Sequence, residues 1–193
     1  MITSLEIENL RGIAKGSVSG LKHLTAIVGT NNSGKSTLLE ALAVASSKGG
    51  LANWWWVACL RGWLGIDGFE QFFYRNSRMC KLAVLKDGQS RPSESFEFKL
   101  SDNAVIDNYL IEQARLFQLS DRRAYIEATS YLETGPSNEA AIIDDNGKAT
   151  DPRLIQGRPV PVANVKFVDL NTKISLEDEW SKAIQKGHWF EKT

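Results

Sequence analysis

Residues 28–37 read VGTNNSGKST and combine the residue types that hold phosphate groups in proteins. Gly29 and Gly34 stand five positions apart, and Lys35 and Ser36 follow at once, which is the Gly-x-x-x-x-Gly-Lys-Ser spacing of a P-loop. In such a loop successive backbone N–H groups turn inward, and the positive end of the following helix faces the same anion. The spacing therefore predicts a nucleotide-binding site.

The residue types assign a role to each part of this loop. The two glycines allow backbone angles and a close ligand approach that a side chain would forbid. Lys35 is expected at the β- and γ-phosphates, the hydroxyl of Ser36 at a Mg²⁺ ion, and Thr37 at the α-phosphate. The predicted ligands are ATP and Mg²⁺. The predicted nucleotide-binding residues of the loop are Gly29, Asn31, Asn32, Ser33, Gly34, Lys35, Ser36 and Thr37, and Ser36 is also the predicted metal ligand.

Strands and a helix must position this loop. Residues 2–10 alternate apolar and acidic side chains, which predicts a strand with one buried face, and residues 11–20 form a turn with a short second strand. Residues 24–28 are a brief apolar run opening onto the loop, as expected of a buried parallel strand. Apolar residues at helical spacing then predict a helix that ends in the glycine-containing segment 46–50.

From residue 79 onward the sequence pattern is mainly that of short β-strands separated by turns. The segment 107–119 is compatible with one helix or with two strands, and 175–187 predicts a helix with a serine N-cap. The fold class expected is an α/β P-loop NTPase lobe, like an ABC-ATPase head, with a mixed, largely antiparallel sheet and few helices. We expect one lobe over 1–193, divided into 1–50, 51–78 and 79–193. The strands expected in the last part are 80–86, 95–100, 123–132, 139–144 and 162–170, with turns at 86–90 and 144–147.

Composition and local hydropathy limit which ligands, which cellular location and which membrane segments are expected. The chain carries 23 basic and 23 acidic residues, which argues against nonspecific binding of nucleic acid by bulk charge but leaves a local basic patch open. Its two cysteines lack CxxC spacing, and the N-terminus lacks the apolar run of a signal peptide, so a cytoplasmic location is expected. The apolar stretch 51–66 is interrupted by Asn53 and Arg61 and is shorter than the roughly 20 residues of a membrane span.

Hydrolysis needs more than a phosphate-binding loop. A P-loop enzyme also uses an Asp at a strand end to hold Mg²⁺ and a group that orients the attacking water. Asp144 with Asp145, in AIIDD, and Asp169, in VKFVDL, are the candidates for that Asp. Both positions are interpreted as structural, since Asp-Asn-Gly is turn chemistry and neither shows a following catalytic acid. The catalytic residues therefore stay unassigned.

The first part of the chain resembles the opening of the ABC-type ATPase heads of the SMC, RecF and OLD groups, most closely the OLD-like AAA ATPases. Asn9-Leu10-Arg11 stands where those heads carry Asn-Phe-Arg/Lys after the first strand, and Asn31-Asn32-Ser33 matches the interior of their loop. The segment GIDGFEQFFYRNS at 65–77 adds to the likeness with the OLD-like proteins. The resemblance covers residues 1–77, and 78–193 loosely.

This resemblance implies that Arg11 lies near the adenine and that two heads dimerise with ATP between them. It also implies a nucleic-acid transaction such as DNA repair or antiphage defence, with DNA, a nuclease or another partner chain involved. The heads carry a signature Ser-Gly motif, a Mg²⁺-binding Asp, a catalytic Glu and a switch His in a C-terminal lobe, and the sequence shows none of these. His23 and His188 are isolated, and Gln89 and Gln118 are both open as the Q-loop residue. An incomplete head is expected, whether truncated, split or degenerate.

Other functions remain as alternatives. A non-hydrolysing nucleotide-sensing module would bind ATP and Mg²⁺ without turnover. A small P-loop kinase would need further helix–strand units, which the β-rich part disfavours. A GTPase is suggested by Asp144-x-x-Gly147 but lacks the NKxD motif, because residues 171–174 read NTKI.

Aromatic and basic residues outside the loop each allow a structural interpretation and a binding interpretation. Trp54, Trp55 and Trp56, with Trp63 nearby, are interpreted first as core packing and second as a partner or base-stacking surface, with at least one facing outward. Four further arginines are interpreted as solvated surface rather than as contacts to a phosphate backbone: Arg75, Arg78, Arg122 and Arg123.

Overall fold

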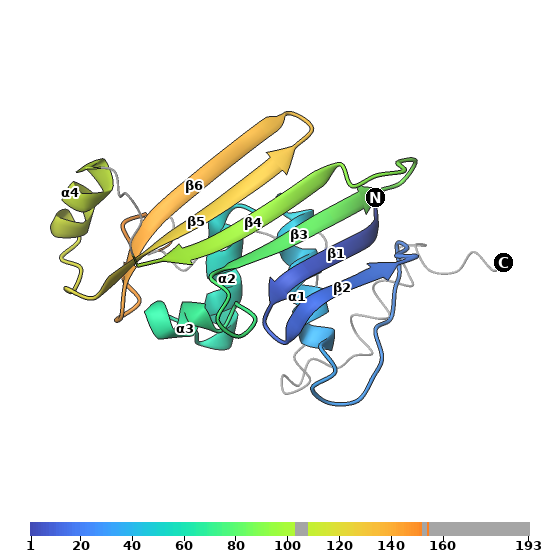
Figure 1. Ribbon diagram of the computed structural model, residues 1–193, viewed down its shortest axis with the longest axis horizontal. Coiled ribbons are helices and arrows are strands. Elements are labelled where there is room, and N and C mark those ends of the chain that lie inside the picture. Colours follow the sequence, from blue (N-terminus) through green and yellow to red (C-terminus); the bar gives the residue numbers. More distant parts are fainter. Residues whose placement is uncertain (103–107, 152–153, 155–193) are drawn as a thin grey trace, which may run out of the picture.

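The computed structural model describes residues 1–102, 108–151 and 154. Six strands of this part of the chain form an antiparallel sheet in the order β2-β1-β3-β4-β5-β6. Three helices lie on one face of it (Figure 1): α1 (Lys35–Ser46), α2 (Leu51–Arg61) and α3 (Ile66–Glu70). Every pairing in this sheet is antiparallel. The strands are β1 (Ile2–Leu10), β2 (Ile13–Ser19), β3 (Met79–Lys86), β4 (Glu94–Ser101), β5 (Arg123–Leu132) and β6 (Gly135–Asp144).

Alternating side chains explain why these segments become strands. In β1, Leu5 and Ile7 are buried against the helices while Glu6 is exposed, which confirms the strand predicted for residues 2–10. Tight turns join β1 to β2 and β5 to β6, so Leu10 pairs with Ile13 and Leu132 pairs with Gly135. The four strands predicted between residues 80 and 144 are likewise confirmed.

Helix α1 (Lys35–Ser46) follows the glycine loop as predicted. It ends at Ser46, and three residues later Gly49 adopts a φ of 69°, where an added Cβ would lie 2.1 Å from the Phe96 ring. Only glycine allows this close approach of the helix end to β4, so the predicted stop is also confirmed. The other helices are α2 (Leu51–Arg61), α3 (Ile66–Glu70) and α4 (Asn108–Leu116). The segment 107–119, left open from sequence, therefore contains a helix.

An aromatic cluster fills the space between α2, α3 and the sheet. Trp54 is 1% exposed and stacks on Phe98 with ring centroids 4.9 Å apart, while Phe72 meets its edge at 5.6 Å. Trp55 is also buried and packs on Phe69. Trp56 is half-buried and packs against the same hydrophobic core, so the structure supports core packing, the first interpretation of the three tryptophans.

The buried parallel strand predicted for residues 24–28 is wrong. This segment is not a strand, and Leu24 and Val28 are 57% and 89% exposed. A buried parallel strand needs a neighbouring strand that accepts and donates its hydrogen bonds. None of the six strands of the described residues pairs with this segment, so the parallel part of the expected mixed sheet is absent from them.

Several expectations lie outside the described residues. These are the strand at 162–170 with Asp169, the helix at 175–187, His188 and the sequence NTKI at 171–174. The single-lobe organisation over 1–193 and its three divisions stay a prediction. Within the described part of the chain, no helix combines the length and the apolar character needed to cross a membrane.

Candidate functional site

The glycine loop (residues 29–34) forms a tight turn directly before α1. Asn32 and Gly34 have positive φ angles of 61° and 85°, and the Ser33 N–H donates to the Thr30 carbonyl at 3.3 Å. Leu38 N–H donates to the Gly34 carbonyl at 2.9 Å, which makes Gly34 the residue where the helical hydrogen bonding starts. The loop and the helix are thus one continuous unit.

Lys35 folds back over this loop. Its Nζ donates to the carbonyl oxygens of Gly29 at 2.8 Å and Thr30 at 2.6 Å, and lies 3.4 Å from Ser33 Oγ. Within the described residues no carboxylate forms a salt bridge with this ammonium. The loop therefore holds a positive charge whose neighbours are neutral oxygens, a setting that favours an added anion.

The N-terminus of α1 adds to this positive potential. Gly34 is the N-cap residue and has no side chain to form a capping hydrogen bond, and the first turn contains no acidic residue. The first N–H groups of a helix have no acceptor inside the helix, and the helix dipole places partial positive charge there. Ser36 is exposed at this end, whereas Thr37 is 6% exposed. The loop residues predicted from sequence are therefore brought together at an uncapped helix N-terminus.

Arg11 reaches the same helix from the turn between β1 and β2. Its Nη1 donates to Glu40 Oε2 at 2.7 Å, and its guanidinium carbon lies 4.8 Å from the centroid of the Trp63 ring. The turn is close to the glycine loop, because a Cβ placed on Gly34 would lie 3.9 Å from Ile13 Cδ1 at the start of β2. The structure thus brings Arg11 to the side of α1.

Backbone hydrogen bonds fix this turn. Arg11 N–H donates to the Phe72 carbonyl at 2.9 Å, and Tyr74 N–H donates to the Asn9 carbonyl at 3.0 Å. Asn9, Arg11 and Arg75 all have φ angles of 52–53°, which are uncommon for residues other than glycine. Such conformations persist only where the surrounding structure imposes them, so the turn has a fixed shape.

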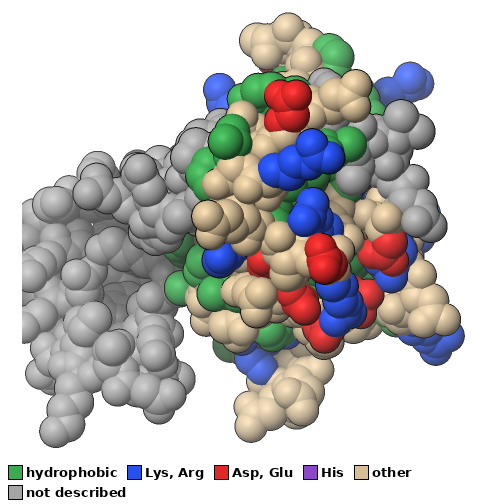
Figure 2. Space-filling view, turned by 90° about the vertical axis from the view of Figure 1, so that its left-hand side faces the viewer, with side chains coloured by type: hydrophobic (Ala, Val, Ile, Leu, Met, Phe, Trp, Pro, Cys, Tyr) green, Lys and Arg blue, Asp and Glu red, His purple; other side chains and the backbone are tan. Residues whose placement is uncertain are grey.

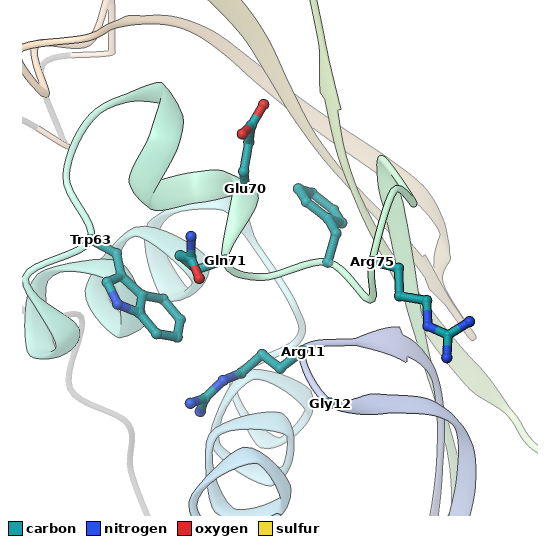
Figure 3. Close-up of a pocket in the computed structure, with 7 residues that line it drawn as sticks. Arg11, Gly12, Trp63, Glu70, Gln71 and Arg75 are labelled. Atoms are coloured by element: carbon teal, nitrogen blue, oxygen red, sulfur yellow. The ribbon is translucent and has the colours of Figure 1, made fainter.

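A cavity of about 440 Å³ opens beside the turn. Figure 3 shows Arg11, Trp63 and Gln71 pointing toward one another, while Arg75 points away from them. A guanidinium beside an indole ring offers both a cation and a flat apolar surface to a ligand. The cavity is lined by Arg11, Gly12, Trp63, Glu70, Gln71, Phe73 and Arg75.

Asp144 is a structural carboxylate. It is fully buried and accepts N–H groups from Ser120 at 3.1 Å, Asn146 at 3.0 Å and Lys148 at 2.8 Å. Asp145 accepts the Ser120 hydroxyl at 2.6 Å. Because β6 is separated from β2 by five strand spacings, about 24 Å, Asp144 is remote from the glycine loop. The structural interpretation of this position is confirmed.

The arginines outside the loop form local contacts. Arg122 pairs with Asp67 at 2.5 Å, and this hydrogen bond raises the pKa of the guanidinium. Arg78 pairs with Asp102 at 3.0 Å, and Arg123 donates to the Leu119 carbonyl. Figure 2 shows acidic and basic side chains interleaved on the described part of the face that carries α4. Arg75, Arg78 and Arg122 are exposed, in line with their interpretation as surface residues, whereas Arg123 is half-buried and donates to main-chain carbonyls.

The remaining predicted candidates lie on loops. His23 is exposed, Gln89 lies after β3 and donates to Glu133, and Gln118 follows α4 with a φ of 52°. Sequence reasoning missed Glu40, which is 5% exposed on α1 and meets both Arg11 and Arg61. The sequence did contain an indication that Glu40 has a special position, because it is the one acidic residue within the apolar run LLEALAVA.

Comparison with known proteins gives two results. Residues 1–150 match the family model described as "AAA ATPase domain", and this range includes the glycine loop, Arg11 and all six strands. The uncharacterized protein MJECL10 from Methanocaldococcus jannaschii is 35% identical over 89 residues. That alignment covers 44% of this chain and 41% of the archaeal protein, so the chain covers less than half of its relative's length.

Proposed function

Because the chain belongs to the AAA ATPase domain family, we propose that it is the ATP-binding N-terminal lobe of an OLD/SMC-like ATPase, with the glycine loop as its P-loop. The observation that carries this proposal is the Lys35 ammonium, held at the Gly29 and Thr30 carbonyls in front of an uncapped helix. A triphosphate supplies the anion that this arrangement lacks.

In the proposed complex, the N–H groups at the start of α1 donate to phosphate oxygens. Lys35 exchanges its loop carbonyls for the β- and γ-phosphates, and the exposed Ser36 hydroxyl is the Mg²⁺ ligand of this chain. When bound, Mg²⁺ neutralises charge on the phosphate oxygens. The donors fit both ligands, because backbone N–H groups and an ammonium suit phosphate while a hydroxyl oxygen suits a hard cation.

We propose that hydrolysis uses groups from outside the described residues. Asp144, at the end of the edge strand β6, already accepts three backbone N–H groups and is not available for Mg²⁺ at the loop. We propose that a C-terminal lobe, in the same polypeptide or in a partner, completes the site. The exposure of Leu24 and Val28 just before the loop supports a covering segment there, since apolar surface favours burial.

The wider role follows from the resemblance to OLD and SMC heads. Two ATP-bound copies would associate through the nucleotide in the cytoplasm, and turnover would drive a nucleic-acid transaction such as DNA repair or antiphage defence. DNA and a nuclease are the partners that this role implies. These statements follow by fold-level analogy with those heads.

A second candidate is a module that binds ATP without hydrolysing it. The engagement of Asp144 by backbone amides favours this candidate for the chain acting alone. A steady-state assay of phosphate release separates the two: turnover after addition of a C-terminal lobe supports the ATPase, and binding without turnover in every combination supports the sensor.

Thermal unfolding of the full chain tests the proposal. MgATP at millimolar concentration is expected to raise the melting temperature, because a ligand that binds only the folded state stabilises it. Lys35→Ala is expected to abolish the shift. Lys15→Ala is the control, since Lys15 is an exposed lysine on β2 that pairs with Glu8. An unchanged melting temperature for the unsubstituted chain would contradict the proposed function.

A further inference from the structure

Glu40 is a buried carboxylate between two arginines. Its Oε2 accepts Arg11 Nη1 at 2.7 Å, and its Oε1 accepts Arg61 Nε at 2.6 Å and also meets Arg61 Nη2. Arg11 comes from the turn between β1 and β2, Glu40 from α1 and Arg61 from the end of α2. One carboxylate therefore joins three elements that are distant in sequence.

The contacts on the two carboxylate oxygens differ. Arg61 directs two nitrogens to a single oxygen, so it fixes the orientation of the Glu40 carboxylate. Arg11 uses one N–H for the other oxygen and lies over Trp63. Within the described residues, its remaining side-chain N–H groups have no acceptor. Arg11 is thus held in place by Glu40 and Trp63, while part of its guanidinium is left unused by the described part of the chain.

The pair of Arg11 and Glu40 lies at the helix that begins at the glycine loop. Glu40 is five residues after Lys35 on the same helix, a rise of about 7.5 Å. Arg11 and Trp63 line the cavity beside the turn (Figure 3). Among the residues that line the cavity, Arg11 and Arg75 are cationic, while the one carboxylate, Glu70, pairs with Arg78, so the wall carries a net positive charge that suits a bound anion.

We infer that Glu40 is a positioning residue for nucleotide binding, which holds the Arg11 guanidinium over Trp63 so that its free N–H groups meet the nucleotide bound at the glycine loop. The inference rests on the proposed function and extends it to a residue that does not touch the ligand. Without Glu40, Arg11 keeps its charge but loses the contact that fixes its direction. Nucleotide affinity then falls through Arg11 alone.

Calorimetric titration of the full chain with MgATP tests this coupling. Glu40→Gln and Arg11→Ala are each expected to weaken the Kd by about tenfold, and the double variant is expected to bind no more weakly than either single variant. Additive losses would show that Glu40 acts independently of Arg11 and would overturn the inference. The control is Glu94→Gln. Glu94 on β4 forms a 2.6 Å ion pair with Lys86 on β3, and loss of its charge is expected to leave the Kd for MgATP unchanged.

Two further measurements keep the test decisive. Circular dichroism checks that Glu40→Gln is folded, and if it is not, Arg11→Lys replaces it, since lysine keeps the charge but loses the planar fork. Arg11→Lys is expected to weaken the Kd severalfold, and unchanged binding by both Arg11 variants would overturn the inference. If Lys35→Ala abolishes binding while Glu40→Gln does not alter it, only the inference fails. If the unsubstituted chain does not bind MgATP, the proposed function fails and the inference with it.

Discussion

The Lys35 ammonium lies 2.6 Å from the carbonyl oxygen of Thr30, five residues earlier in the chain. This contact closes the glycine loop on its own lysine at the mouth of α1. The loop can close in this way because Gly34 takes a φ of 85°, a conformation that places Lys35 at the first helical position. The shape of the candidate site thus depends on backbone angles as much as on charge.

Gly34→Ala is expected to lower both stability and nucleotide binding. A Cβ at Gly34 has room, since its nearest neighbour is 3.9 Å away, but the positive φ costs an alanine about 1 kcal/mol. Relief of that strain changes the loop, so the melting-temperature shift caused by MgATP should shrink. Differential scanning calorimetry with and without MgATP measures both effects.

Gly88→Ala is the matched control for this substitution. Gly88 has a φ of 78° in the turn after β3, and a Cβ there would meet nothing within 4 Å. The same strain should lower its melting temperature by a similar few degrees while the MgATP shift is retained. Equal loss of the shift in both variants would show that Gly34 acts through stability alone.

Trp54→Ala is expected to be among the most destabilising substitutions in the chain. Trp54 is 1% exposed and stacks on Phe98, so its removal leaves a cavity in the aromatic cluster at a cost of about 3–5 kcal/mol. Trp56→Ala is expected to cost less, because Trp56 is only half-buried. Urea unfolding followed by circular dichroism compares them, and equal losses would contradict the burial order.

The two cysteines are expected to react differently with a thiol reagent. Cys59 is exposed on α2, whereas Cys80 is buried on β3 beneath the helices. Partial burial raises the pKa of the Cys59 thiol, which slows its reaction without blocking it. One equivalent of thiolate dye should be released from the folded chain and a second only after unfolding. Release of both at one rate would contradict the burial of Cys80.

Burial also makes Cys80 a source of alkaline destabilisation. Burial raises the pKa of the folded thiol well above the ordinary value of 9.0. The contribution of the protonated thiol to the free energy of unfolding is therefore fully present below pH 9. Above that pH the unfolded chain loses the proton while the folded chain keeps it, and stability falls by up to about 1.4 kcal/mol per pH unit. Cys80→Ala should show a shallower decline between pH 9 and 10.5 in urea unfolding. Parallel curves would contradict this assignment.

Local patterns in the sequence were enough to predict the glycine loop, the helix that follows it and most strands of the sheet. The spacing of Gly29, Gly34 and Lys35 identified the loop, and the alternation in 123–132 predicted β5, because these signals lie within one element. The apolar run at 24–28 gave a wrong prediction of a buried strand, since burial of a strand depends on a neighbouring strand that no local pattern specifies.

Contacts between distant elements came only from the tertiary structure. The sequence marked Arg11 by its place after the first strand and contained Glu40 as a lone acid in an apolar helix, but it did not pair them. Their contact depends on the register of β1 with β2 and on the packing of α1 against the sheet, which bring residues 29 positions apart to 2.7 Å. The sequence by itself determined which groups could bind a phosphate. Only the folding of the chain decided which groups stand beside them, because side-chain proximity is a property of packing rather than of order along the chain.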